Sequence, residues 1–203
     1  DSNGGGGVIG EGDVQWMTAA SGVLHKEFHE TEWSKTGGEF QMVQLWVNLP
    51  EKDKMSAPKY QAIKNADLGR YTFDGGEVEV IAGEYNGAKG AASTFTPIYM
   101  LNSKMKKGAK LEFCFPENYN TGLLVIEGSI SINGTEKAPT GHFVLMANDG
   151  EVFSIEASED AIVLVLSGEP INEPIAAHGP FVMNTRKELV EAWDDFQAGK
   201  FGQ

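Results

Sequence analysis

An imidazole and a carboxylate stand two residues apart in the stretch from Gly22 onward, at His25 and Glu27. On a β-strand, side chains two positions apart project from the same face, so these two groups can approach one ion. Imidazole and carboxylate are ligands that suit a divalent first-row metal such as Fe(II), without any thiolate. Two ligands make only half of such a site. A hydrogen-bonded surface pair explains the same two residues, and at this point both interpretations stay open.

The other three histidines are weaker candidates for a site. His29 follows His25 by four positions, as in a zinc protease helix, but that motif needs a glutamate directly after the first histidine and Lys26 is there instead. On a strand, His29 would lie about 13 Å from His25 at ~3.3 Å per residue, which is too far for a shared ion. His142 and His178 stand beside glycine turns, and we expect both to be surface or structural histidines.

The composition limits the classes of function. The chain of 203 residues has a net charge of −13, and such an acidic surface disfavours direct binding of nucleic acid. No apolar stretch reaches the roughly 18 residues of a membrane span, and we expect no membrane contact and no signal peptide. The single cysteine, Cys114, lies in an apolar run and is interpreted as a buried structural thiol. We therefore expect a soluble protein of a reducing compartment, the cytoplasm.

Short segments of strand character, separated by glycine-rich turns, dominate the chain. The expected strands cover residues 14–17, 40–49, 77–82, 96–100, 111–115, 123–132, 142–146, 152–155 and 161–167. This spacing predicts a mostly β fold of the sandwich or barrel type. Asn133-Gly134 predicts a tight hairpin. The capping box Thr185–Glu188 predicts one amphipathic helix that ends at Gly199. Its apolar stripe is expected to pack on the core, with a partner-binding face as the alternative.

Four stretches, in this order, resemble the pirin family of bicupin proteins. They are Gly12–Ala19 with Gly22–Glu27, Gln44–Pro50 with Pro58–Gln61, Val80–Glu84, and Ser167–Ile175 with Gly179–Thr185. The resemblance covers almost the whole chain and implies two tandem cupin barrels of the double-stranded β-helix (jelly-roll) type. The first would occupy residues 1–92, and the second residues 93–203 with the short C-terminal helix. It also implies one mononuclear metal, usually iron, in the N-terminal domain.

The metal ligands of that family are three histidines and one glutamate. The last histidine and the glutamate carry over onto His25 and Glu27. The other two belong to a His-Pro-His segment that should lie upstream, and nothing in this sequence matches it. We therefore expect the first barrel to be incomplete at its start. Residues 15–19 and Trp46 would line its pocket or its core, and Gly22 would allow close approach of the backbone to whatever lies within.

The resemblance implies a quercetin 2,3-dioxygenase type of activity, in which a flavonol binds through its 3-hydroxyl and Glu27 acts as the base. Two alternatives stay open. One is a metal-dependent regulatory protein that binds a protein partner without turning over a substrate. The other is an inactive fragment that lacks two of its metal ligands.

The second barrel is expected to hold no metal. Where a cupin would place its histidine pair, residues 115–122 contain no histidine. Glu117 and Tyr119 of this segment would be polar wall residues of an empty barrel. The second domain of the family commonly lacks a metal, which agrees with this interpretation.

Overall fold

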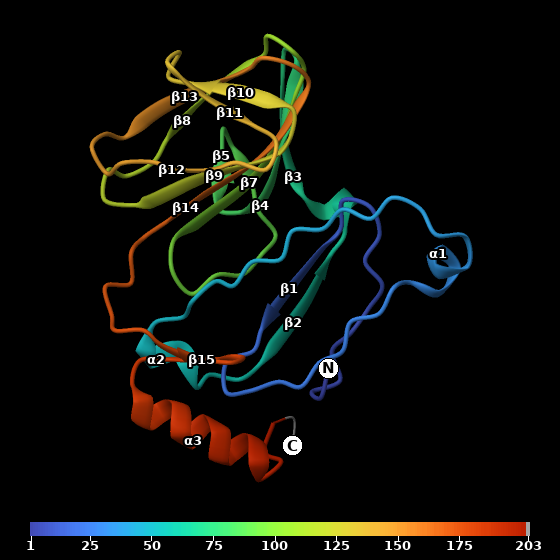
Figure 1. Ribbon diagram of the computed structural model, residues 1–203, viewed down its shortest axis with the longest axis vertical. Helices are drawn as coiled ribbons and strands as arrows, with labels where there is room; N and C mark the ends of the chain where they lie inside the picture. The colour runs from blue at the N-terminus through green and yellow to red at the C-terminus, as the bar shows by residue number, and fades with distance from the viewer. Residues whose placement is uncertain (202–203) are drawn as a thin grey trace. The chain divides into compact units, whose positions relative to one another are not determined.

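The computed structural model describes residues 1–201, which fall into two compact units. The first unit contains the chain up to Ala62 and again from Ile171, and the second runs from Ile63 to Pro170. Figure 1 labels most of the elements of each unit. The expected mostly β fold with a C-terminal helix is confirmed.

The second unit is built from two antiparallel β-sheets. The six-stranded sheet has the order β12-β9-β14-β7-β4-β3, and the four-stranded sheet has the order β11-β10-β13-β8. The strands are β3 (Gly69–Phe73), β4 (Gly76–Ala82), β7 (Ile98–Met105), β8 (Lys110–Cys114), β9 (Asn120–Glu127), β10 (Ser129–Ile132), β11 (Glu136–Pro139), β12 (Phe143–Leu145), β13 (Val152–Ala157) and β14 (Ala161–Gly168). A 3₁₀ turn (Asn65–Asp67) precedes them, and β5 (Glu84–Tyr85) pairs with β6 (Ala88–Lys89).

The core of this unit follows from the alternation of side chains along each strand. In β8, Leu111 and Phe113 are buried among the core residues, whereas Glu112 and Cys114 are exposed. Successive residues of a strand face opposite sides of the sheet, so burial of Phe113 turns Cys114 outward. The expected burial of the Cys114 thiol is therefore wrong.

The domain boundary expected between residues 92 and 93 lies inside the second unit. β4 precedes that boundary and β7 follows it, yet the two strands pair over most of their length, with Val80 opposite Leu101. This pairing places residues 63–92 in one compact unit with the strands that follow. How the complete protein divides into cupin domains stays a prediction.

The first unit has little regular structure. Its elements are β1 (Val14–Thr18), which pairs with β2 (Lys59–Ile63); α1 (Thr31–Thr36); α2 (Glu51–Lys54); β15 (Ala176–His178), which pairs with β16 (Phe181–Met183); and α3 (Arg186–Gln197). The strand expected over residues 40–49 is not formed, and this segment has no regular secondary structure.

The expected turn and helix signals act locally as predicted. Asn133 and Gly134 have φ values of 50° and 72° between β10 and β11, and the capping box at Thr185 is present. The stripe of α3, however, is not core: Val190 is 60% and Trp193 49% exposed. The helix packs on the small β15–β16 sheet, which is too narrow to cover it. None of the helices in residues 1–201 is long and apolar enough to cross a membrane.

Candidate metal centre

His25 and Glu27 approach each other, but not on a strand as expected. They lie in an irregular segment after β1, and 3.9 Å separates His25 Nδ1 from Glu27 Oε1. The chain reaches this arrangement through a turn in which Ala20 has a φ of 41° and Gly22 a φ of 126°. The N–H of Gly22 donates to the carbonyl of Ala19 at 2.8 Å and closes the turn.

Two contacts hold the segment that carries the pair. The N–H of Ser2 donates to the carbonyl of Leu24 at 2.7 Å, and the N–H of Leu24 donates to the Ser2 hydroxyl at 3.0 Å. A side chain on Gly22 would overlap the ring of Phe201. Position 22 therefore requires glycine because the ring of Phe201 lies against it, a contact that the sequence alone does not indicate.

The pair fits a metal as half of a ligand set. Neighbouring donors at about 2.1 Å from an ion lie about 3.0 to 3.4 Å apart, so the 3.9 Å between His25 Nδ1 and Glu27 Oε1 must shorten by about half an ångström for both to bind one ion. Both side chains are accessible, at 37% and 46% exposure. Within residues 1–201, no group of three His, Cys, Asp or Glu side chains is placed to hold a metal ion.

The remaining histidines have other surroundings. His29 stacks on Trp33, with ring centroids 4.9 Å apart, and meets Phe40 edge-on at 5.0 Å. His142 and His178 are exposed, as the sequence predicts. The expected pocket walls are less enclosed than predicted: β1 is half-buried along its length, and Trp46 is 67% exposed.

A second candidate site, which the sequence revealed only in part, lies in the second unit. A cavity of about 180 Å³ is lined by Glu117 and Tyr119, the two residues expected on the wall of an empty barrel. Asp149 and Glu151 also line it. Sequence reasoning missed these two because they belong to the loop before β13, and only the fold brings that loop beside Glu117.

The Pirin family pattern matches residues 1–47, and the Pirin C-terminal cupin domain matches residues 100–202. A Pseudomonas aeruginosa protein, provisionally named a quercetin 2,3-dioxygenase, is 44% identical over 99% of this chain and 71% of its own length. Pirin-1 of Arabidopsis thaliana is 38% identical over 100% of this chain and 70% of its own.

The solved structures include a close neighbour. The crystal structure of quercetin 2,3-dioxygenase from Acinetobacter baumannii is 50% identical, with a TM-score of 0.96, over 100% of this chain and 71% of that one. Similarity of this extent and level in both sequence and structure establishes that the chain belongs to the pirin family of bicupin proteins.

Proposed function

We propose that the protein is a metal-dependent oxygenase of the quercetin 2,3-dioxygenase type, with a flavonol as substrate and His25 and Glu27 as two of its metal ligands. The observation that carries the proposal is the 3.9 Å approach of these two donors in a chain that is 50% identical to a solved quercetin 2,3-dioxygenase. Fe(II) is the expected metal, because imidazole and carboxylate suit a divalent first-row ion.

A bound metal would supply Lewis acidity toward the 3-hydroxyl of the flavonol and a route for electrons to dioxygen. His25 would hold the ion through a ring nitrogen, and Glu27 through one carboxylate oxygen. The second oxygen of Glu27 would then be free to accept the 3-hydroxyl proton, which makes Glu27 the base. The remaining ligands must be additional to this pair.

The test uses the 203-residue chain and, where its coding sequence extends further, the longer product. Each is loaded anaerobically with Fe(II) and dialysed, and its iron content is measured. Loss of quercetin absorbance and uptake of oxygen are then followed together. We expect the iron-loaded full-length product to consume both, and His25→Ala and Glu27→Gln to lower its retained iron and its turnover. His178→Ala, which changes an exposed histidine of the same unit, should leave both unchanged.

Two outcomes would overturn the proposal. If the fully iron-loaded protein consumes neither quercetin nor oxygen, the oxygenase activity is excluded, and a metal-dependent binding protein is the remaining alternative. If wild type, His25→Ala and Glu27→Gln retain the same amount of iron, His25 and Glu27 are not metal ligands. If only the 203-residue chain fails to keep iron, the ligands beyond His25 and Glu27 are shown to lie outside it.

A further inference from the structure

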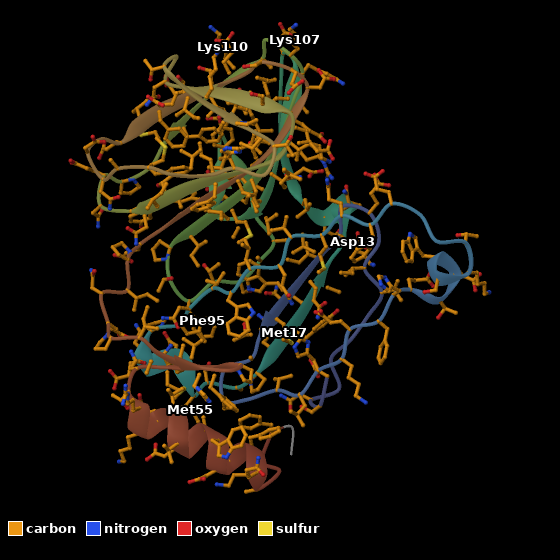
Figure 2. The ribbon with its side chains drawn as sticks, viewed as in Figure 1. Asp13, Met17, Met55, Phe95, Lys107 and Lys110 are labelled. Carbon is orange, nitrogen blue, oxygen red and sulfur yellow. The ribbon has the colours of Figure 1, made fainter. Side chains whose placement is uncertain are left out.

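The cavity of the second unit lies at one end of the two sheets. It is lined at the end of β8 by Phe115 and at the start of β13 by Phe153, with Tyr119 beside them. The ring centroids of Phe115 and Phe153 are 6.1 Å apart. Lys110 begins β8, whereas Phe115 follows the last residue of that strand, so the lysines labelled in Figure 2, Lys107 and Lys110, lie toward the opposite end of β8.

The rim of the cavity carries only negative charge. Glu117, Asp149 and Glu151 line it, and no lysine, arginine or histidine does. Over residues 1–201, none of these three carboxylates has an ion-pair partner. A wider depression of about 590 Å³ shares Glu117 and Glu151 with the cavity, so the carboxylates stand where the cavity opens. The rim therefore attracts cations, and nothing on it neutralises that attraction.

The inner wall offers a hydroxyl group and aromatic rings. Thr121 lines the cavity, and its buried Oγ1 is 2.8 Å from the Oγ of Ser167. Either hydroxyl, that of Thr121 or that of Ser167, can be the donor in this hydrogen bond. The hydroxyl that accepts keeps its own hydrogen, which has no acceptor among the described residues. Burial, with the nearby charge of Glu169 and with Tyr99, raises the pKa of Tyr119, so its phenol stays neutral at pH 7.

We propose that this cavity is a second binding site, independent of metal, for a small primary amine that carries one aromatic ring. The volume of 180 Å³ is large enough for one aromatic ring, since an enclosed apolar cavity of ~150 Å³ accepts benzene, although this cavity is partly open and its lining is mostly polar. The ring of the ligand would lie against the small exposed parts of Phe115 and Phe153, which are 5% and 6% exposed, and its ammonium group would meet the carboxylates of the rim. Aromatic side chains also attract a cation directly through their π faces. A metal ion is the weaker occupant, because no three ligating side chains within residues 1–201 converge.

The experiment titrates the metal-free 203-residue chain with 2-phenylethylamine and measures binding by calorimetry and ligand-observed NMR. The neutral 2-phenylethanol and the anionic phenylacetate are the matched ligands. Glu117→Gln and Glu151→Gln remove charge at the rim with little change in shape. The control is Glu159→Gln, an exposed acid in the turn after β13, at the end of that strand away from the cavity.

We expect the amine to bind more tightly than the alcohol and the acid not to bind. Each rim variant should lower the affinity for the amine about threefold to fivefold, as for exposed charge pairs. Added salt should also lower that affinity, because it screens the same charges. Glu159→Gln should have no effect. The proposal fails if the amine does not bind at about 10 mM, if amine and alcohol bind equally, or if Glu159→Gln weakens the amine as much as the rim variants do. Since no metal is present, failure here is separate from failure of the oxygenase.

Discussion

Glu79 is the most buried carboxylate of the protein's described residues, with 2% of its surface exposed. Its oxygens accept hydrogen bonds from Lys104 at 2.8 Å and Asn102 at 2.9 Å, and Arg70 lies 3.3 Å away. Burial acts to raise the pKa of Glu79, but the hydrogen bonds and the two positive charges outweigh it. The pKa therefore lies below the ordinary value of 4.5. A single side chain thus joins three strands of the six-stranded sheet, β3, β4 and β7.

Replacing this carboxylate with an amide should destabilise the second unit. Glu79→Gln leaves Arg70 and Lys104 without their buried partner, and we expect a loss of about 2 kcal/mol at pH 7, less than for a fully buried pair because Lys104 is partly exposed. Because the folded pKa is lowered, the stabilisation is complete above pH 4.5 and is lost as the pH falls through the folded value. Urea unfolding at pH 7 and at lower pH measures both effects.

The matched control for this variant is Glu84→Gln. Glu84 is exposed and lies 3.6 Å from Lys89, so its loss should change stability by less than ~1 kcal/mol. Wild type and Glu79→Gln should converge in stability as the pH falls below 4.5. A difference between them that persists unchanged at low pH would contradict the ionic role of Glu79.

At the scale of the element, the glycines at the two ends of β10 differ in what surrounds them. Gly128 has a φ of 73° and Gly134 a φ of 72°, so both adopt the left-handed conformation. A Cβ on Gly128 would overlap the carbonyl oxygen of Asp160, whereas a Cβ on Gly134 would have no atom within 4 Å. The sequence signal at Asn133-Gly134 therefore reports only local turn chemistry, while the constraint on Gly128 comes from a neighbouring strand connection.

This contrast gives a paired prediction. Gly134→Ala should destabilise the fold by about 1 kcal/mol, the conformational penalty alone. Gly128→Ala should cost at least about 2 kcal/mol, because the backbone of Asp160 must also move. Urea unfolding followed by far-ultraviolet circular dichroism measures the stability of both variants. Equal losses of stability in the two variants would show that the close approach of the Asp160 carbonyl to residue 128 adds no cost.

At the scale of the whole molecule, the two units differ in their interiors. Apart from Pro50, every buried apolar side chain of the described residues belongs to the second unit, which starts at Ile63 and ends at Pro170. The described residues of the first unit instead expose large apolar side chains, including Phe28 at 84%, Phe40 at 60% and Trp46 at 67%. Burial of apolar surface is the main stabilising contribution to a fold, so the second unit should hold most of the stability.

Limited digestion with chymotrypsin tests this difference, because that protease cleaves after exposed aromatic residues. We expect the first cuts between Phe28 and Trp46, and a resistant product that contains residues 63–170. Mass spectrometry of early time points identifies the products, and digestion in urea gives the control in which all aromatic sites are cut. First cuts within β7, β9 or β14 would contradict the assignment of stability to the second unit.

The sequence by itself determined the fold class, the turn at Asn133, the capped helix after Thr185 and the pairing of His25 with Glu27 as one candidate site. The turn, the helix and the fold class depend on local conformation and on alternation or spacing over a few residues, which the chain carries in its own order. In the second unit, β4, β8, β12, β13 and β14 were therefore predicted with small errors at their ends. The strands β3 and β11 were not predicted, and the expected strand 123–132 joined β9 and β10 into one. His25 and Glu27 do approach each other, but in an irregular segment and not through the strand alternation that was expected.

Only the tertiary structure decided which faces became buried and which distant residues met. It turned Cys114 to the surface, left residues 40–49 without regular secondary structure and joined β4 to β7 across the expected boundary. It also brought the loop that carries Asp149 beside Glu117. The physical reason is that burial and strand pairing depend on contacts between segments far apart in the chain, and no local pattern specifies those contacts.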